Sequence, residues 1–304
     1  MPKVSVIIPN YNHALFLEQR IESVLNQSFQ DFELILLDDN STDHSLRILA
    51  GYKNHPRVSH LIVNAVNSGS PFCQWNRGVA VARGHYLWIA ESDDWAEPDF
   101  LQEMLNEVEQ RENVVIAFSL AKYMNCEGNE LWKIEESMDV NCYPGEDFIR
   151  NFLVRFNSIY NVSMTLLHRE TYLSIDFSTI ANLKLCGDWL LYVMLCRHGN
   201  VIRIGKALSN YRIHDNNTST KAEKEGQSFL EGIHIFNYIQ RELGGVERIN
   251  NSFYWSKQWV KYQLRFNFSA SVQASIRALT LKYNKLIFSF YFLYRWYYRL
   301  KKRV

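Results

Sequence analysis

Residues 4–12 read VSVIIPNYN, and residues 32–43 read FELILLDDNSTD. Each stretch begins with an apolar run and ends abruptly in polar residues. Such runs are typical of strands buried on both faces of a parallel sheet. Between them, apolar residues at helical spacing predict a helix over residues 15–27. A strand, a helix and a second strand predict a βαβ unit at the start of the chain.

The same alternation continues along the chain and predicts an α/β fold, with a mostly parallel, doubly wound sheet flanked by helices. Further strands are predicted at 58–63, 86–90, 114–118, 201–204 and 208–213, and helices at 45–52, 72–82, 99–109 and 189–196. Residues 120–180 show no clear period. From Gln227 onward the pattern is mostly helical.

Three of the predicted strands end in polar clusters, and ligands of such sheets bind at the carboxyl ends of the strands. The strongest cluster is Glu91-Ser92-Asp93-Asp94 after the strand at 86–90. Clustered carboxylates repel one another, and a divalent cation shared with phosphates would relieve that repulsion. Taken alone, the segment is equally consistent with an acidic turn that caps the next helix.

The other candidate residues also have two interpretations each. Asp39, with Asp38, could accept hydrogen bonds from a nucleotide, or could serve as turn and cap chemistry. Tyr11 could stack on a base or pack at the rim of the sheet. Asp188 lies just before an apolar helix and could be a catalytic base or the N-cap of that helix. His214 follows a predicted strand, and a solitary histidine in such a place is usually structural.

Composition and motifs exclude several classes of protein. The 304 residues are 47% hydrophobic and 21% charged, which is ordinary for a globular chain. Five irregularly spaced cysteines indicate a reducing compartment. The first strand begins at Val4, which leaves no room for a signal peptide and predicts a cytosolic start. Nucleophile-elbow, P-loop, dinucleotide-binding and zinc-protease motifs are absent from the sequence.

Charge is distributed unevenly. From Ile249 to the end there are 11 Lys or Arg and no Asp or Glu, which leaves 22 basic and 32 acidic residues before that point. The last 24 residues hold nine aromatic side chains, and Arg295, Arg299 and Lys302 fall on one helical face. These features favour a helix in the interface of an anionic membrane. The alternative is a helix packed on the catalytic domain, while nothing else in the chain supports binding of nucleic acid.

Taken together, four ordered motifs resemble glycosyltransferase family 2, whose Rossmann-like catalytic fold is called GT-A. Residues 5–12 are similar to the opening strand of that family, and residues 36–43 to its second-strand signature. Asn67-Ser68-Gly69, Asn76-Arg77-Gly78 and Ala82-Arg83-Gly84 resemble the segment before the fourth strand. Residues 88–95, WIAESDDW, resemble the metal motif. The resemblance covers residues 3–115 well and 160–220 more loosely.

The resemblance implies a role for each matching residue. The implied contacts to the nucleotide sugar are Pro9, Tyr11, Asp39, Asn67, Arg83 and Asp93, with Tyr11 stacking on the base and Asp39 hydrogen bonding to it. Asp93, Asp94 and His214 would contact Mn²⁺ or Mg²⁺, and His214 belongs to a loop that closes over the donor. Asp188 matches the general base of the family.

Three positions depart from the family pattern. Glu91 replaces the commoner aspartate of the metal motif, and Gly187 replaces a frequent glutamate before Asp188. Residues 173–177 lack the usual glycines, so the acceptor-side loop is expected to be shaped differently.

The sequence and the resemblance together predict an inverting glycosyltransferase with a UDP-sugar donor and a glycan or lipid-linked acceptor. It is expected at the inner face of the cell membrane, in surface polysaccharide or glycolipid synthesis. Residues 1–220 are expected to form the catalytic domain, with a nucleotide half (1–115) and an acceptor half (116–220), followed by a helical region (221–304). A catalytically inactive nucleotide-binding scaffold and a sugar-nucleotidyltransferase remain the alternatives.

Overall fold

The computed structural model describes residues 1–214, 226–244, 247–266 and 268–301. The strands are β1 (Val4–Asn10), β2 (Phe32–Asp38), β3 (Val58–Val63), β4 (Tyr86–Ile89), β5 (Trp95–Ala96), β6 (Val114–Met124), β7 (Glu130–Lys133), β8 (Val140–Pro144), β9 (Thr165–His168) and β10 (Asn200–Arg212). The helices before β10 are α1 (Ala14–Leu25), α2 (Ser45–Tyr52), α3 (Pro71–Val81), α4 (Phe100–Glu109), α5 (Gly145–Phe148), α6 (Arg169–Ser174), α7 (Ser178–Ala181) and α8 (Gly187–Cys196). Short π and 3₁₀ segments cover Ile149–Leu153 and Val162–Met164.

The strands form one sheet in the order β3-β2-β1-β4-β9-β6-β10-β5, with β7 and β8 paired at its margin. The first four strands are mutually parallel, since β1 pairs in parallel with both β2 and β4, and β2 with β3. β9 enters antiparallel between β4 and β6. The carboxyl ends of β1, β2 and β4 therefore share one edge of the sheet, as the sequence predicts.

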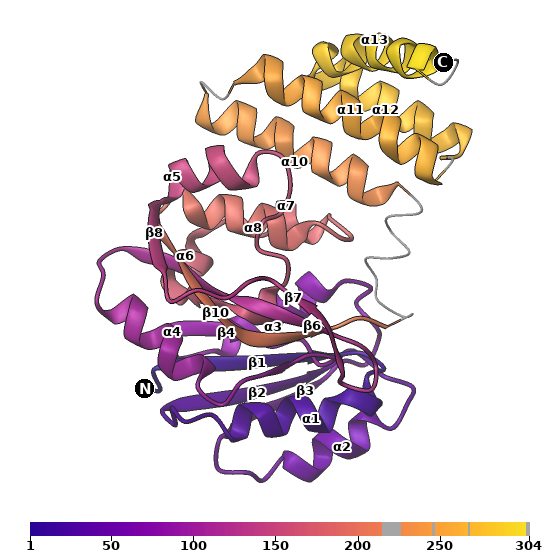
Figure 1. Ribbon diagram of the computed structural model, residues 1–304. Helices are drawn as coiled ribbons and strands as arrows, with labels where there is room; N and C mark the ends of the chain where they lie inside the picture. Colours follow the sequence, from indigo (N-terminus) through magenta and orange to yellow (C-terminus); the bar gives the residue numbers. More distant parts are fainter. Residues whose placement is uncertain (215–225, 245–246, 267, 302–304) are drawn as a thin grey trace. The chain divides into compact units, whose positions relative to one another are not determined.

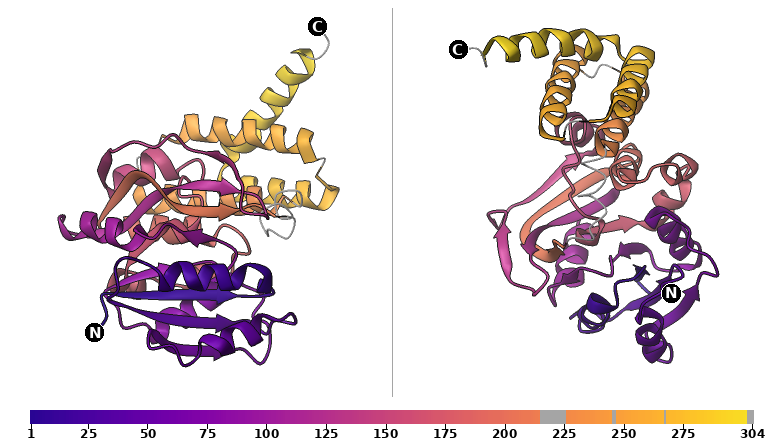
Figure 2. Two further views of the ribbon diagram at one scale, coloured as in Figure 1. Left: turned by 60° about the horizontal axis from the view of Figure 1, so that its bottom comes forward. Right: turned by 90° about the vertical axis from the view of Figure 1, so that its right-hand side faces the viewer.

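Helices cover both faces of this sheet because its strands are apolar on both sides. Val6 and Ile8 of β1 face a core with Leu17 of α1 and Leu49 of α2. The opposite face meets α3, where a Cβ on Gly78 would lie 2.5 Å from the side chain of Ile7, so a larger residue there would have to displace Ile7. Figure 1 shows α1 and α2 along one side of β1–β3, and the turned view of Figure 2 shows α1 lying lengthwise over them. The predicted α/β architecture is confirmed.

β10 differs from the sequence prediction, which placed two strands at 201–204 and 208–213. The structure has one strand, Asn200–Arg212, whose pairing with β6 shifts register between Arg203 and Ala207 and again before Ser209. The shift coincides with Gly205, where an added Cβ would lie 2.4 Å from Oγ of Ser137. Bulges of this kind break the apolar alternation, which explains why the sequence shows two runs.

The chain divides into two compact units that interleave along the sequence. The first contains Met1–Gly145, Ile159–Asn182 and Met194–His214, and the second contains Glu146–Ser158, Leu183–Val193 and Asp215–Val304. The boundary predicted at residue 220 lies outside the described residues. The second unit includes two segments of the predicted acceptor half, and Asp188 lies in one of them.

Long helices make up most of the second unit: α10 (Gln227–Leu243), α11 (Arg248–Phe266), α12 (Ala270–Tyr283) and α13 (Lys285–Lys301). α13 packs on α11 through Tyr291, whose ring stacks on Trp259 with centroids 3.9 Å apart. Ser256 of α11 donates a hydrogen bond to the carbonyl of Ile287. The predicted helical extension is thus confirmed. Within the described residues, no helix has the length and apolar character needed to cross a membrane.

Candidate active site

Asp39, just after β2, is the centre of a hydrogen-bonded loop at the carboxyl edge of the sheet. Its carboxylate accepts hydrogen bonds from the backbone and hydroxyl of Ser68 and from the amides of Asn64 and Gln74. Asn67 donates to the backbone carbonyl of Asp39 at 3.0 Å. The structure therefore brings Asp39 and Asn67, two of the predicted nucleotide contacts, into one network.

Pro9 and Tyr11 lie beside this loop at the end of β1. Pro9 is buried and in register with Leu37 of β2, and the ring of Tyr11 is 47% exposed. The exposure of Tyr11 matters because a ring packed into the core could not stack on a ligand. The ends of β1 and β2 are held together by Asn10, whose Nδ2 donates a hydrogen bond to the carboxylate of Asp38 at 2.9 Å.

The loop after β4 carries the carboxylates of the predicted metal motif. Glu91 is tied inward, because Nε1 of Trp75 donates to its carboxylate at 2.7 Å and its backbone N–H donates to Ser163. Burial, followed by the negative charge of Asp93, raises the pKa of Glu91 to about 8. Glu91 is thus fixed by α3 and the segment before β9.

Asp94 is also turned into the protein and is only 1% exposed. One of its oxygens accepts from Nδ2 of Asn161 at 2.7 Å, and the other accepts from the backbone N–H of Arg212 at 3.0 Å. The guanidinium of Arg20, wholly buried, lies 4.0 Å away. Burial, followed by the charge of Asp93, raises the pKa of Asp94 to about 7.

Two arginines compensate the negative charge of this loop. Arg20 donates through Nε to the carbonyl of Glu91 at 2.8 Å, and burial lowers its pKa to about 10. Arg212 donates to the carbonyl of Asp93 at 2.9 Å, and its guanidinium lies 4.5 Å from the ring centroids of both Phe16 and Trp95. A buried acidic loop of this kind requires such counter-charges.

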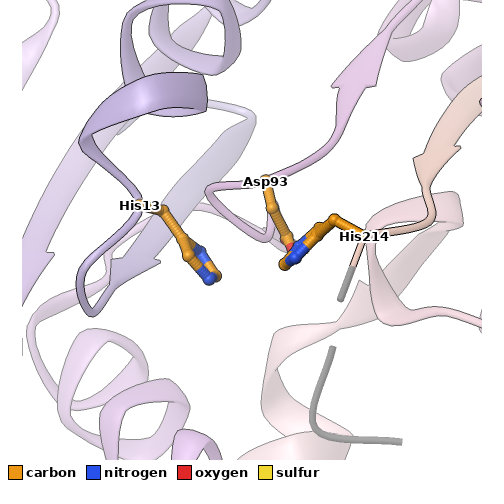
Figure 3. A group of neighbouring side chains, drawn as sticks. All are labelled: His13, Asp93 and His214. Carbon is orange, nitrogen blue, oxygen red and sulfur yellow. The ribbon is translucent and has the colours of Figure 1, made fainter. Parts of the chain in front are cut away.

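Asp93 points the other way and meets two histidines. Nε2 of His214 lies 3.0 Å from Oδ2 of Asp93. His13, at the start of α1, has its ring centroid 5.7 Å from that of His214. One potential ligand atom from each of the three residues lies within 4.8 Å of the others, and Figure 3 shows the three side chains converging.

Two imidazoles and one carboxylate form a suitable donor set for a divalent transition metal. Burial alone would raise the pKa of Asp93, but the hydrogen bond from His214 and the nearby histidines outweigh it and lower that pKa. Asp93 therefore stays ionised, as a metal ligand must. Of the predicted ligands, the structure brings Asp93 and His214 together, and it ties both oxygens of Asp94 to protein donors.

Arg83 lies away from the other predicted nucleotide contacts. Its guanidinium pairs with Glu33 at 2.7 Å, and its backbone N–H donates to Ser5 and Glu33, near the amino ends of β1 and β2. The carboxyl edge that holds Asp39 is at the other end of these strands. The structure therefore gives Arg83 a role in closing the turn before β4.

Asp188, the predicted base, belongs to the second unit, where it begins α8. Its carboxylate accepts from Nδ2 of Asn157 at 2.8 Å and from the backbone N–H of Trp189 at 2.7 Å. The side chain is partly exposed, yet burial raises its pKa to about 7, and these two hydrogen bonds oppose the rise. A carboxylate with such a pKa is suited to take a proton near neutral pH.

The turn before Asp188 is held by Glu231 of α10, a buried residue. Its carboxylate accepts from the backbone N–H groups of Lys184, Leu185 and Cys186 at 2.8, 3.0 and 2.7 Å. Trp189 adds a second anchor, because its indole N–H donates to the carbonyl of Leu153 at 2.9 Å. The helical region thus shapes the local backbone around the predicted base.

Several of these residues were not among the predicted ones: His13, Arg20, Asn161, Arg212 and Glu231. One signal was available for Arg20, which lies on the apolar stripe of α1 with Leu17, Ile21 and Val24, where a charge needs a buried partner. Glu231 also lies among buried residues of α10. The partners themselves come from distant segments, so no local pattern identifies them.

The sequence is similar to several known proteins. Residues 5–172 match the family model described as glycosyl transferase family 2. Over 249 residues the chain is 34% identical to an uncharacterized glycosyltransferase of Haemophilus influenzae, covering 81% of this chain and 91% of that protein. Over 223 residues it is 31% identical to the chondroitin synthase of Escherichia coli, covering 73% of this chain. The matched region spans only 30% of that synthase.

Among solved structures, residues 1–349 of S. aureus TarS in complex with UDP-GlcNAc have a similar fold. The TM-score is 0.69 at 16% sequence identity, and the alignment covers 94% of this chain and 81% of the TarS chain. The likeness confirms the α/β fold that the sequence predicts.

Proposed function

Because this chain belongs to glycosyltransferase family 2, we propose that it transfers a sugar, with inversion, from a nucleotide-sugar donor to a glycan or lipid-linked acceptor. The observation that carries the proposal is the meeting of the Asp39 network and the His13–Asp93–His214 group at one edge of the sheet. UDP is the proposed nucleotide, supported by the UDP-GlcNAc complex of TarS. The chondroitin synthase relative supports a role in surface polysaccharide synthesis.

We assign the nucleotide to the loop around Asp39, with Asn67 and Pro9 shaping its walls and Tyr11 stacking on the base. The amide and hydroxyl donors that fix Asp39 leave its geometry preorganised, which lowers the entropic cost of binding. Asp93 and His214 would hold a divalent cation. Asp94 would hold the loop after β4 in place and would not bind the cation, because both of its carboxylate oxygens already accept hydrogen bonds from the protein.

The reaction we propose is a single in-line displacement. The acceptor hydroxyl loses its proton to the carboxylate of Asp188 as its oxygen bonds to the anomeric carbon, and the bond to the diphosphate breaks on the opposite side. When bound, a divalent cation supplies positive charge that stabilises the departing nucleoside diphosphate. The pKa of about 7 for Asp188 places the base near the optimum for proton transfer at neutral pH.

We also propose that α13 docks on an anionic membrane surface, where a lipid-linked acceptor would be presented. Its inner face packs through Ile287 and Tyr291, while Phe292, Leu293, Trp296 and Tyr297 are between 42% and 65% exposed. These four fall on one helical face, an arrangement suited to the headgroup region. Of the predicted basic face, Arg295 is described, whereas Lys302 and the side chain of Arg299 lie outside the described part of the chain.

The catalytic proposal is tested by incubating the protein with a panel of nucleotide sugars and membrane extract, with Mn²⁺ or with EDTA. We expect one donor to be consumed only with metal, and Asp188→Ala to reduce transfer strongly without weakening UDP binding. If UDP binds but no donor is consumed, the protein is a catalytically inactive nucleotide-binding scaffold. Release of inorganic diphosphate from a sugar phosphate and UTP would instead indicate a nucleotidyltransferase.

The membrane proposal is tested by sedimentation with liposomes at low salt. We expect the full chain to sediment with anionic vesicles and not with neutral ones, and Trp296→Glu to abolish sedimentation. Met138→Glu, which changes an exposed residue of the first unit, is the matched control and should sediment like the wild type. Equal sedimentation of the wild type and Trp296→Glu would exclude α13 as the docking helix.

A further inference from the structure

His13 belongs to the His13–Asp93–His214 group, but neither the local sequence nor its position at the start of α1 explains why a histidine occurs there. It occupies the N-cap position of α1, yet its side chain makes no capping hydrogen bond. Ser, Thr, Asp and Asn are the residues that stabilise this position, so capping does not account for a histidine there. The ring instead points across the loop toward Asp93 and His214 (Figure 3).

Within the part of the chain that the structure describes, only one ring nitrogen of His13 has a hydrogen-bond partner. Nδ1 lies 2.8 Å from Oγ of Ser92, a residue that is only 1% exposed. When Nδ1 carries the proton and donates it to this hydroxyl, Nε2 keeps the lone pair that a metal requires. Histidine ligands in proteins are generally oriented in this way, through a hydrogen bond from the other ring nitrogen.

The distances also suit a shared ion. Ligand atoms 2.0–2.2 Å from a metal lie roughly 3 to 4.4 Å apart, depending on the angle between them. The three ligand atoms here all lie within 4.8 Å of one another, with Asp93 and His214 already 3.0 Å apart.

We infer that His13 is a third protein ligand of the divalent cation, through Nε2, which makes the centre one of two imidazoles and one carboxylate. The inference rests on the proposed function in one respect, that a cation binds at Asp93 and His214. Imidazole nitrogen favours transition metals over the harder Mg²⁺ and Ca²⁺. The centre should therefore bind a transition metal such as Mn²⁺ more tightly than Mg²⁺ or Ca²⁺, and three protein ligands leave further coordination positions for diphosphate oxygens and water.

The test uses the full chain and Mn²⁺ alone, with electron spin-echo envelope modulation to count the coordinated imidazole nitrogens. We expect two nitrogens in the wild type and one in His13→Gln. Loss of a ligand should weaken Mn²⁺ binding by at least the 10–100-fold typical of perturbing a ligand's supporting shell. Mg²⁺ should compete poorly for the site.

His44 provides a matched control, because it occupies the N-cap position of α2 as His13 does in α1, also without a capping hydrogen bond. His44→Gln should keep two coordinated nitrogens and the wild-type affinity. Ser92→Ala, which removes the partner of Nδ1, is a second variant that should weaken binding without removing a ligand. The number of coordinated nitrogens in the wild type can be measured whether or not the variants fold.

The outcomes separate this inference from the proposed function. A single nitrogen in the wild type, or two nitrogens retained in His13→Gln, would overturn the role of His13 and leave the proposed metal site intact. If the wild type binds no Mn²⁺, or binds it equally well as Asp93→Asn, the metal site fails and the role of His13 fails with it.

Discussion

The loop after β4 and the turn before α8 each hold an aspartate whose pKa is raised to about 7, in very different surroundings. At Asp94, burial and the neighbouring charge of Asp93 raise the pKa, and the cation of Arg20 opposes the rise. At Asp188, burial raises it, and hydrogen bonds from Trp189 and Asn157 oppose the rise. The two carboxylates reach a similar pKa through different interactions.

The comparison shows that a raised pKa does not by itself identify a base. Asp94 is 1% exposed and its oxygens are directed at Asn161 and Arg212, so a substrate hydroxyl could not reach it without breaking those bonds. Asp188 is partly exposed. Accessibility and the charges nearby therefore separate a structural carboxylate from a candidate catalytic one.

The largest expected effect is that of Asp188→Asn on catalysis. Loss of the base should lower kcat by about 10²- to 10⁴-fold, because the amide cannot accept the acceptor's proton. The affinity for UDP, measured by calorimetry, should not change. If Asp188→Asn retained more than a tenth of the wild-type kcat, Asp188 would not be the base and the contrast with Asp94 would disappear.

Removing the buried cation should affect folding. Arg20→Met leaves the carboxylates of the β4 loop without their nearest counter-charge, and breaking such a buried pair costs about 3–5 kcal/mol of unfolding free energy. Arg241→Met is the matched control, because the side chains of Arg241 and its partner Glu242 are 70% and 25% exposed, and this pair should contribute about 0–1 kcal/mol. Denaturant titration measures both, and equal losses would contradict the importance of burial.

The same comparison shows what the sequence could predict. The strand that ends at Ile89 and the carboxylates after it are contiguous, so the pattern predicted both the sheet edge and the acidic loop. Asp93 was predicted for the same reason. Arg20, Asn161 and Arg212 reach this loop from α1, from the segment before β9 and from β10, and such long-range partners leave no local pattern.

The turn before α8 shows more clearly what could not be predicted from the sequence. Asp188 was predicted from a short resemblance, but the carboxylate that holds its turn, Glu231, comes from α10, in a region where the sequence indicated only helices and a basic tail. An acidic residue on a helix is most often solvated, so its burial against three backbone N–H groups could be recognised only in the folded chain.

Glu231→Gln is the next prediction in order of size. An amide oxygen cannot accept as strongly from three N–H groups as a carboxylate does, so the turn at Cys186 should loosen and shift the base. A displacement of about 1 Å lowers rates by as much as about 10²-fold, which should be seen in kcat and not in the KM for the donor. Glu242→Gln, on the same helix, should behave as the wild type. A change confined to stability, with kcat unchanged, would restrict Glu231 to a structural role.

The smallest effect is a shift in pH dependence. The base must be ionised, so kcat/KM should fall about tenfold for each pH unit below the pKa of Asp188, about 7. Asn157→Ala removes a donor that favours the ionised carboxylate, so the pKa should rise and the midpoint should move to higher pH. Loss of the negative charge of Glu231, which raises the pKa of Asp188, should move the midpoint of Glu231→Gln to lower pH. Shifts in opposite directions from these two variants would identify Asp188 as the titrating group, since a carboxylate of the β4 loop, with its own cations, would respond to neither.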